Sequence, residues 1–351
     1  MKRIGYRTVL FMAILAGTLL LYGCQRNGAG DANTIILYSN AISDGRGEWI
    51  QERAAAELGL TVQLVDMGGV GLANRLIAER FNPIGDVVFG LNQLLWADLV
   101  DHNVLAPYIP AWANEIPAYL NHEDGYFHAV ALMANLLIYD VYQFSPADPP
   151  PTDWLDLWNN ARFHGRHAFS EALTGSTTHM ILSGIFARFL DPAGHLGVSA
   201  EGWANIHAKY DTGINLSGQD LYAVISNPAN NVALGQMWHT GRPPREAQFG
   251  VRSNFVIPAI GIPFSVEGVG LINGSNNPDA ARRFIDWFGS AEVMQAFGLE
   301  FNYLPANPNA LAGLPQEVLE IAALPHQHIN WDIVSAHMQS WLEHIYLTYL
   351  Q

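Results

Sequence analysis

Four of the five residues from 174 to 178 carry a hydroxyl group, and the segment Thr174-Gly175-Ser176-Thr177-Thr178 opens a predicted helix. The first turn of a helix exposes backbone N–H groups without intrahelical partners, and these groups together with hydroxyls can bind an anion. An ordinary N-cap needs only one hydroxyl. Ser176 and Thr177 are therefore candidate contacts for an anionic or polar ligand, and simple capping is the alternative.

A tryptophan and a histidine end a second candidate segment. Trp238 and His239 follow the apolar run 232–237, which has the composition of a strand. An indole at the edge of a cleft can stack on a flat or cationic ring, so both residues are candidate ligand contacts. A tryptophan that only packs within the protein is the alternative.

Three further positions carry groups capable of polar chemistry. Glu267 begins a predicted strand and could contact a cationic group or pair with Arg252. Arg252 could instead hold a phosphate or a carboxylate in a bidentate manner. Solvated surface charges are the alternative for both. His326 and His328 have a spacing seen in metal sites, but no carboxylate or cysteine cluster accompanies them, so no metal site is predicted.

The elements that must position these groups alternate along the chain. Strands are predicted at 34–38, 61–65 and 86–89, with helices at 48–58, 72–80 and 92–100. This order is typical of right-handed βαβ units and a parallel sheet. Ligands bind beyond the carboxyl ends of the strands in such sheets. The candidate contacts at these ends are Ser39, Asn40, Gly69 and Asn92, with Gly68 and Gly90 beside them.

The second part of the chain repeats the pattern. Residues 146–151 (PADPPP) form an extended spacer, because proline cannot continue a helix. Further helices are predicted at 154–158, 174–190, 203–210, 279–288, 291–297 and 332–349, and strands at 167–170, 232–238 and 266–272. We therefore expect an α/β protein with two lobes that are hinged near residues 135–140 and 255–262.

The composition excludes several classes of protein. Half of the 351 residues are hydrophobic and 14% are charged, so the chain has enough apolar surface to fold. Its length suggests one large domain or two. The formal net charge of −15 argues against nucleic-acid binding, and the single cysteine excludes a disulfide framework. Only one stretch is long and apolar enough to approach a bilayer span.

That stretch has the pattern of an export signal. Lys2, Arg3 and Arg7 precede the uncharged apolar run 10–21, as in a secretory signal peptide. The run ends in Leu21-Tyr22-Gly23-Cys24, which resembles a bacterial lipobox. The resemblance implies that residues 1–23 are removed, that Cys24 is lipidated, and that the polar segment 24–33 is a flexible tether. An uncleaved anchor with a buried cysteine is the alternative.

Catalytic motifs are not evident. The sequence contains no G-x-S-x-G, H-E-x-x-H or G-x-x-x-x-G-K-[ST] motif, so no catalytic residue and no cofactor is predicted. Carboxylates far apart in sequence could still meet in space, as in a secreted glycosidase. A lipid-anchored hydrolase is therefore the alternative from a different functional class.

Four stretches carry a family resemblance: ILYSN (36–40), GLANRLIAERFNPIGDVVFGLNQLL (71–95), VEGVGLINGSNNPDAARRFIDWFGSAEVMQAF (266–297) and FNYLPANP (301–308). Together they resemble the extracellular solute-binding proteins of ABC importers, in the group that contains thiamine, ferric-iron, phosphosugar and aminophosphonate binders. The second stretch looks especially like the thiamine binders. The resemblance implies the hinged, two-lobed fold of type II periplasmic binding proteins, with lobe one formed by residues 34–135 plus 262–351 and lobe two by residues 136–261.

The resemblance also bears on the ligand. Tyr303, or Phe301 beside it, lies where thiamine binders place an aromatic residue, and Tyr126 with Phe127 resembles another aromatic segment of their cleft; core packing is the alternative for each. Ferric binders carry adjacent tyrosines where this chain has Trp238-His239, and an indole offers no oxygen to hard ferric iron. The expected order is therefore a thiamine-like solute, then a phosphorylated or phosphonate solute, then ferric iron.

The resemblance further implies how such a protein works. An exported, lipid-anchored monomer on the outer face of a membrane or in the periplasm captures a small molecule between its closing lobes. The closed form then docks on an ABC permease in the membrane.

Overall fold

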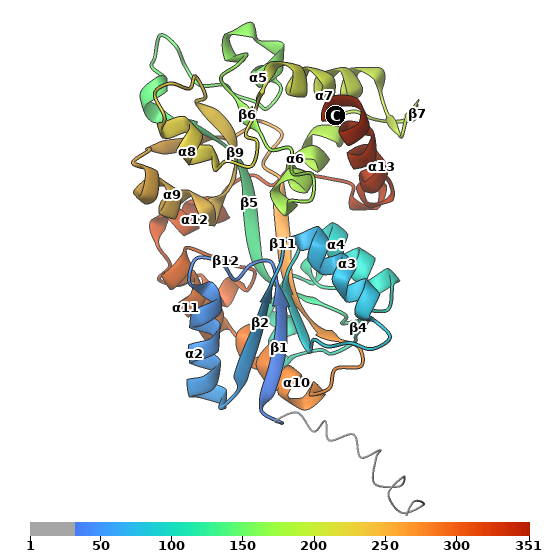
Figure 1. Cartoon of the computed structure of the whole chain (residues 1–351). Helices are drawn as coiled ribbons and strands as arrows, with labels where there is room; N and C mark the ends of the chain where they lie inside the picture. The colour runs from blue at the N-terminus through green and yellow to red at the C-terminus, as the bar shows by residue number, and fades with distance from the viewer. Residues whose placement is uncertain (1–31) are drawn as a thin grey trace, which may run out of the picture. The chain divides into compact units, whose positions relative to one another are not determined.

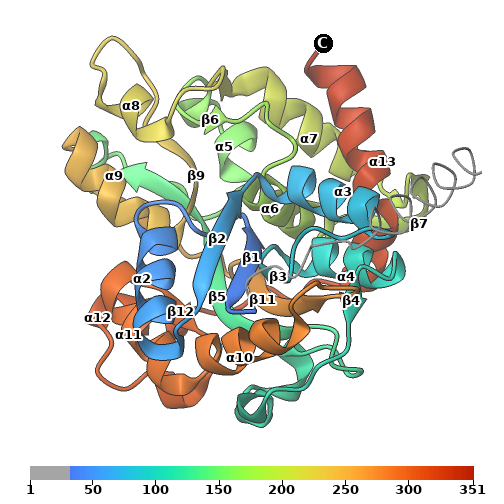
Figure 2. The ribbon, with the colours of Figure 1, turned by 60° about the horizontal axis from the view of Figure 1, so that its bottom comes forward.

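Alternating apolar residues of β1 (Thr34–Ser39) build two core layers at once. Ile35 and Leu37 belong to the core on one face of the sheet and Tyr38 to the core on the other, because successive side chains of a strand point to opposite faces. The helices on the first face are α2 (Arg46–Leu58), α10 (Pro278–Phe288) and α11 (Ala291–Phe301), and those on the second are α3 (Gly69–Glu79) and α4 (Gln93–Asp101) (Figures 1 and 2).

The computed structural model describes residues 32–351. The predicted signal segment 1–23, Cys24 and nearly all of the predicted tether lie outside them. Within residues 32–351, no helix combines the length and the apolar character needed to cross a membrane.

The sheet of lobe one is mixed rather than parallel. β1 lies between β2 (Thr61–Asp66) and β3 (Val87–Gly90) and is parallel to both, as predicted. β3 then pairs antiparallel with β11 (Phe264–Ile272), and β11 pairs antiparallel with β5 (His128–Asp140). The predicted parallel pairing holds for the three strands from which it was inferred, β1, β2 and β3. β11 runs antiparallel to β3 because it re-enters the sheet from lobe two, in the opposite direction.

β5 is the strand that joins the two lobes. Its first half pairs with β11, and its second half pairs with β9 (Leu234–Trp238) and β10 (Ser253–Val256). Figure 1 shows β5 and β11 running from the lower lobe, lobe one, toward the upper lobe, lobe two. The sequence predicted a crossing strand near residues 135–140 but did not show that it begins at His128, because most residues of β5 are buried on both faces and show no alternation.

The remaining elements are short or belong to lobe two. The helices are α5 (Asp156–Asn159), α6 (Ser176–Phe186), α7 (Ala200–Thr212), α8 (Leu221–Ser226), α9 (Arg242–Phe249), α12 (Gln316–Ala322) and α13 (Trp331–Tyr349). The strands are β4 (Leu105–Ala106), β6 (Ala168–Phe169), β7 (Leu190–His195), β8 (Ile214–Asn215) and β12 (Leu304–Pro305). The 3₁₀ helices are η1 (Ala111–Glu115), η2 (Ala118–Leu120), η3 (Val141–Gln143), η4 (Ala161–Phe163), η5 (His239–Gly241) and η6 (Pro308–Ala310). The helix expected over 174–190 ends at Phe186.

The last helix packs with lobe two. Val334, Met338, Trp341 and Ile345 of α13 belong to the same core as residues of α6 and α7, and the views of Figures 1 and 2 place α13 beside these helices. The same core also includes Leu94 of α4 in lobe one, so the assignment of residues 262–351 to lobe one stays a prediction. The sequence showed the apolar face of α13 but not its partner.

A third crossing explains this position. Between α12 and α13 the chain runs alongside the segment that leads into β11: the N–H of Ile262 donates to the carbonyl of Pro325 at 2.8 Å, and the N–H of Gln327 donates to the carbonyl of Ile262 at 2.9 Å. His326 stacks on Phe264, with ring centroids 3.9 Å apart. Three segments therefore connect the lobes, where two were expected. The exact lobe boundaries stay a prediction.

The packing of α13 predicts a stability effect. The Trp341 ring is fully buried, lies 4.4 Å from the Phe186 ring between centroids, and donates its indole N–H to the Leu196 carbonyl at 2.9 Å. Trp341→Ala should lower the free energy of unfolding by about 3–5 kcal/mol, because it leaves a cavity in a packed core. Tyr346→Ala, at a residue of the same helix that is 52% exposed, should change it by less than about 0.5 kcal/mol. Urea unfolding followed by circular dichroism measures both, and equal effects would contradict this packing.

Candidate ligand-binding cleft

A cavity of about 390 Å³ lies where the carboxyl ends of β1 and β2 meet the start of α6 and the end of β9. It is lined from both lobes, which is the arrangement expected of a hinged binding protein. The predicted site residues that line it are Asn40, Gly69, Ser176, Thr177, Trp238, Glu267 and Tyr303. Their contact with a ligand stays a prediction.

Two predicted residues lie just behind the cavity wall. The Ser39 hydroxyl accepts a hydrogen bond from the N–H of Ala41 at 2.9 Å and is fully buried. The side-chain oxygen Oδ1 of Asn92 caps α4 by accepting from the N–H of Leu95 at 3.1 Å. Both residues shape the loops at the strand ends, and neither lines the cavity.

Two others, Tyr126 and His239, do not line it. Tyr126 lies beside His122, with ring centroids 5.1 Å apart, and packs against the core under α3 and α4. His239 faces a separate, smaller cavity, and its Nδ1 accepts from the N–H of Ala134 at 3.1 Å. Burial lowers the pKa of His239 to about 3, so the ring is neutral. Trp238 and His239 diverge because η5 begins immediately after β9.

Asn40 is held by a close backbone approach. Its side-chain oxygen accepts from the N–H of Leu91 at 2.7 Å. Gly90 has φ of 98°, and a Cβ there would come within 2.4 Å of this oxygen, so only glycine fits. The loops after β1 and β3 are thereby fixed to each other at the edge of the cavity.

The hydroxyl groups at the start of α6 do not act as an ordinary N-cap. The N-cap position is Gly175, and no side chain caps the helix, so the capping alternative was wrong. The Thr178 hydroxyl accepts from the Gln236 amide at 2.8 Å. The Ser176 hydroxyl accepts from the Asn92 amide at 2.9 Å, which joins lobe two to lobe one. Residues 175–178 line the cavity, so the uncapped first turn of α6 lies at its wall.

The start of α3 lies on the same cavity. Its N-cap, Gly68, also lacks a side-chain cap, and Gly68 and Gly69 both line the cavity. The other helix starts are of both kinds. Side chains cap α4 (Asn92), α7 (Ser199), α8 (Asp220), α11 (Ser290) and α13 (Asn330), whereas α2, α5, α9, α10 and α12 also lack a side-chain cap. Two uncapped helix starts, each with a partial positive charge, therefore meet one cavity.

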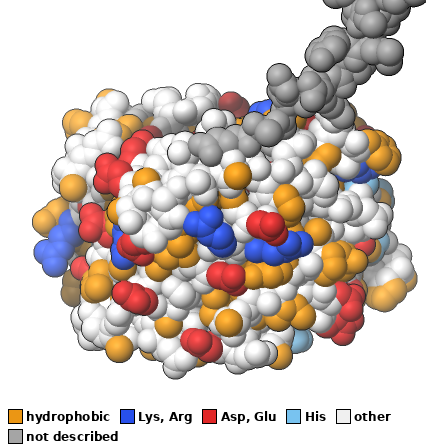
Figure 3. Space-filling view, turned by 90° about the horizontal axis from the view of Figure 1, so that it is seen from below, with side chains coloured by type: hydrophobic (Ala, Val, Ile, Leu, Met, Phe, Trp, Pro, Cys, Tyr) orange, Lys and Arg blue, Asp and Glu red, His pale blue; other side chains and the backbone are white. Residues whose placement is uncertain are grey.

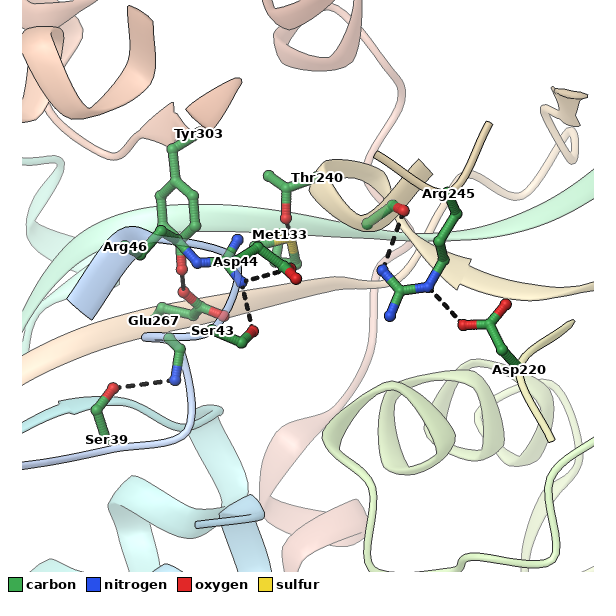
Figure 4. Close-up of polar contacts among 12 residues, drawn as sticks. Ser39, Ser43, Asp44, Arg46, Met133, Asp220, Thr240, Arg245, Glu267 and Tyr303 are labelled. Atoms are coloured by element: carbon green, nitrogen blue, oxygen red, sulfur yellow. Dashed lines mark hydrogen bonds and ion pairs between the residues drawn. The ribbon is translucent and has the colours of Figure 1, made fainter. Parts of the chain in front are cut away.

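One arginine comes from each lobe, and both were missed in the sequence. Arg46 of α2 is only 5% exposed. One of its terminal nitrogens donates to the Ser43 hydroxyl at 2.8 Å and to Asp44 at 3.3 Å (Figure 4). Its Nε is buried and has no partner among residues 32–351. The signal for Arg46 was its position just after the turn that follows β1.

The second arginine approaches from lobe two. Arg245 donates through Nε to Asp220 at 2.8 Å and through a terminal nitrogen to the Gly241 carbonyl at 3.2 Å (Figure 4). Its guanidinium carbon lies 4.6 Å from the centroid of the Trp238 ring. Arg252, the cation considered from the sequence, is exposed and does not line the cavity.

The indole ring of Trp238 is largely covered by other residues of the protein. Arg245 covers its ring, and the backbone of Gly241 is so close that a Cβ there would come within 2.5 Å of the indole. These contacts favour the packing alternative for Trp238 over stacking on a flat ligand.

Glu267 and Tyr303 form a buried pair in the cavity wall. The Tyr303 hydroxyl donates to the Glu267 carboxylate (Figure 4), and the Arg46 guanidinium carbon lies 5.8 Å from the centroid of the Tyr303 ring. Burial raises the pKa of Glu267 to about 7, although the bond from Tyr303 and the charge of Arg46 lower it. The alternative pairing of Glu267 with Arg252 is not present.

The described residues offer no cluster of metal ligands, and the surface seen from below has no region of a single charge. Within the part of the chain that the structure describes, no group of three or more histidine, cysteine, aspartate or glutamate side chains could hold a metal ion. Figure 3 shows acidic, basic and apolar side chains interspersed over the face seen from below.

The raised pKa of Glu267 predicts a pH-dependent stability. Between the ordinary pKa of 4.5 and about 7, the folded protein holds a proton that the unfolded chain releases. The stabilisation present below pH 4.5 is therefore lost as the pH rises through 7. Glu267→Gln does not titrate, so the stability of the native protein relative to this variant should fall by about 3 kcal/mol between pH 4.5 and 8. Urea unfolding of ligand-free protein measures the difference, with exposed Glu52→Gln as the matched control; parallel profiles would contradict it.

The chain matches known proteins over most of its length. Residues 48–326 match the family described as bacterial extracellular solute-binding protein. The chain is 35% identical over 320 residues to the probable ABC transporter periplasmic-binding protein y4fP of Sinorhizobium fredii, a match that covers 90% of this chain and 86% of that protein.

Solved structures show the same fold. The ferric binding protein from Campylobacter jejuni has a TM-score of 0.73 at 18% identity, covering 88% of this chain and 97% of that one. The periplasmic binding protein AfuA from Actinobacillus pleuropneumoniae, with fructose-6-phosphate bound, has a TM-score of 0.71 at 15% identity, covering 90% and 98%. The predicted α/β fold of type II periplasmic binding proteins and the predicted class, an ABC-transporter solute-binding component rather than an enzyme, are confirmed. The chain therefore belongs to the family of bacterial extracellular solute-binding proteins.

Proposed function

We propose that this protein captures a small solute carrying a phosphoryl or similar oxyanion group between its two lobes and delivers it to an ABC permease in the membrane. The observation that carries the proposal is the pair of uncapped helix starts, α3 and α6, that share one cavity with the unpartnered Nε of Arg46. Free backbone N–H groups, the helix dipoles and a guanidinium all favour an anion. The likeness to a binding protein with fructose-6-phosphate bound supports the same chemistry.

The cavity favours this solute over the thiamine-like one that the sequence placed first. A thiamine-like cation would need the face of Trp238, which Arg245 covers, and it would lie near two arginines. Glu267 offers it a carboxylate, so a thiamine phosphate, which has both a cationic ring and an anion, is the second candidate. Ferric iron is less favoured, because the Tyr303 oxygen is already bonded to Glu267 and Trp238 supplies no oxygen ligand.

Closure would act through the contact between the lobes beside the bound anion. Asn92 of lobe one donates to Ser176 of lobe two at 2.9 Å, at the helix start that would hold the solute. A ligand that contacts both helix starts interacts better with the closed arrangement than with an open one, and it shifts the population by that difference. The three crossing segments would provide the hinge.

The ligand class can be tested by calorimetry and thermal shift on the purified protein, refolded to remove carried ligand. The panel holds inorganic phosphate, hexose phosphates, an aminophosphonate, thiamine, thiamine phosphate and ferric citrate, with the unphosphorylated sugars as matched controls. We expect the phosphorylated or phosphonate compounds to raise the melting temperature, since a ligand that binds only the folded state stabilises it. A response to thiamine or ferric citrate without any response to the anions would contradict the proposal.

A substitution tests the position of the anion. Thr177→Val keeps the shape of a cavity-lining residue but removes a hydroxyl, and it should weaken binding of the responding anion by about tenfold, the effect of one hydrogen bond to a charged group. Thr61→Val, on an exposed position of β2, is the control and should leave the affinity unchanged. Equal affinities of the two variants would place the anion away from the start of α6.

A further inference from the structure

Glu267 differs from the other carboxylate that lines the cleft. Asp220 forms an ion pair with Arg245 at 2.8 Å, whereas Glu267 has no ion pair among residues 32–351. Glu267 is 8% exposed, and the hydrogen bond to its carboxylate comes from the uncharged hydroxyl of Tyr303. The cleft thus contains a buried acid whose charge is not directly neutralised.

The residues nearest to Glu267 on β5 and α2 do not form an ion pair with it. Glu267 lies on β11 opposite Ala131 of β5, at a register shift of the strand pair. Arg46 of α2, whose charge acts on Glu267, is bonded to Ser43 and Asp44.

The groups on the other sides of the cavity do not supply a counter-charge either. Across the cavity, Arg245 and Asp220 neutralise each other. Behind it, His239 is held neutral by burial, which keeps its pKa low. Arg46 and Arg245 thus each have another carboxylate as their ion-pair partner, and the charge of Arg46 reaches Glu267 without a direct contact. Glu267 therefore adds a negative charge to a site that would receive an anion.

We propose that Glu267 takes up a proton when the anionic solute enters, so that the cleft binds solute and proton together. The inference rests on the proposed anionic solute. The proton comes from the buffer, the new bond is O–H on the Glu267 carboxyl, and the protonated acid can then donate this O–H to the solute. Two negative charges in a cavity of about 390 Å³ repel each other more strongly than in water, because the surrounding protein screens them less. Uptake of the proton removes this repulsion and turns Glu267 from a repelling group into a hydrogen-bond donor.

The proposal has a defined consequence for affinity. At a pH where free Glu267 keeps its proton, binding needs no uptake and the affinity is independent of this group. Above that pH, binding must take up a proton from solution, and the proton concentration falls tenfold with each pH unit. The dissociation constant should therefore rise about tenfold per pH unit. Glu267→Gln has a permanently uncharged donor of similar shape, and its affinity should lack this rise.

The experiment compares the unaltered protein with Glu267→Gln, with inorganic phosphate as the probe, by calorimetry from pH 6 to 8.5. Ionisation of phosphate itself affects both proteins equally. The dissociation constant of the unaltered protein divided by that of Glu267→Gln therefore reports the effect of Glu267 alone. We expect this ratio to rise about tenfold per pH unit above pH 7. In the unaltered protein, titration in two buffers of different ionisation enthalpy should show uptake of up to one proton at pH 8.

Tyr303→Phe distinguishes titration from a merely structural role. Loss of the tyrosine hydroxyl removes a hydrogen bond that lowers the pKa of Glu267, so the loss of affinity should begin at a higher pH than in the unaltered protein. A structural role of the pair would weaken binding without moving this pH.

The outcomes separate the two proposals. If phosphate binds the unaltered protein and Glu267→Gln with the same pH dependence and without proton uptake, the role of Glu267 is overturned while the anionic solute stands. If phosphate binds neither protein at any pH, both the anionic solute and the proton are rejected.

Discussion

The continuous pairing along β5 is the constraint on which the rest of the structure depends. Its 13 residues contribute to both lobes, with β11 as partner at one end and β9 and β10 at the other. A strand shared by two sheets keeps its backbone hydrogen-bonded along its length, so the lobes cannot separate without losing sheet. The partners of β5 change between Ala134 and Asn135, and Met133 and Asn135, on either side of this change, line the cavity.

The position of this junction decides which groups can meet a solute. The carboxyl ends of β1 and β2 bring the start of α3 to it from lobe one, and the end of β9, bonded through Gln236 to Thr178, brings the start of α6 from lobe two. Each helix start alone is an ordinary feature of an α/β protein. Because both lack a side-chain cap and face the same cavity, their unsatisfied N–H groups become a property of the site.

The sequence predicted the elements with local signals and missed those that depend on distant partners. The short, β-rich apolar run of residues 34–38, followed by a turn signal, and the amphipathic pattern of residues 279–288 were sufficient for β1 and α10. The start of β5 has no such local signal, and the packing of α13 on α6 depends on a crossing that no local pattern marks. The same division holds in the site. Ser176 and Asn40, which line the cavity, could be predicted because helix starts and strand ends are visible in the sequence. Arg46 and Arg245 were missed because their burial in the cleft follows from tertiary structure, and Tyr126 was expected there only by resemblance.

An acidic protein can bind an anion because its surface charges act only over a short distance in salt solution, whereas the groups inside the cavity act on the ligand directly. The chain carries a formal net charge of −15, but its charged side chains are interspersed over the face in Figure 3, and charges on the surface are screened over about 8 Å at physiological ionic strength. Groups inside the cavity are screened much less. Local groups therefore decide whether the anion is bound, and these are the two helix starts, Arg46 and the protonation state of Glu267. The surface charge then acts mainly on solubility and on the rate of encounter, so the overall sign of the protein does not fix the sign of its ligand.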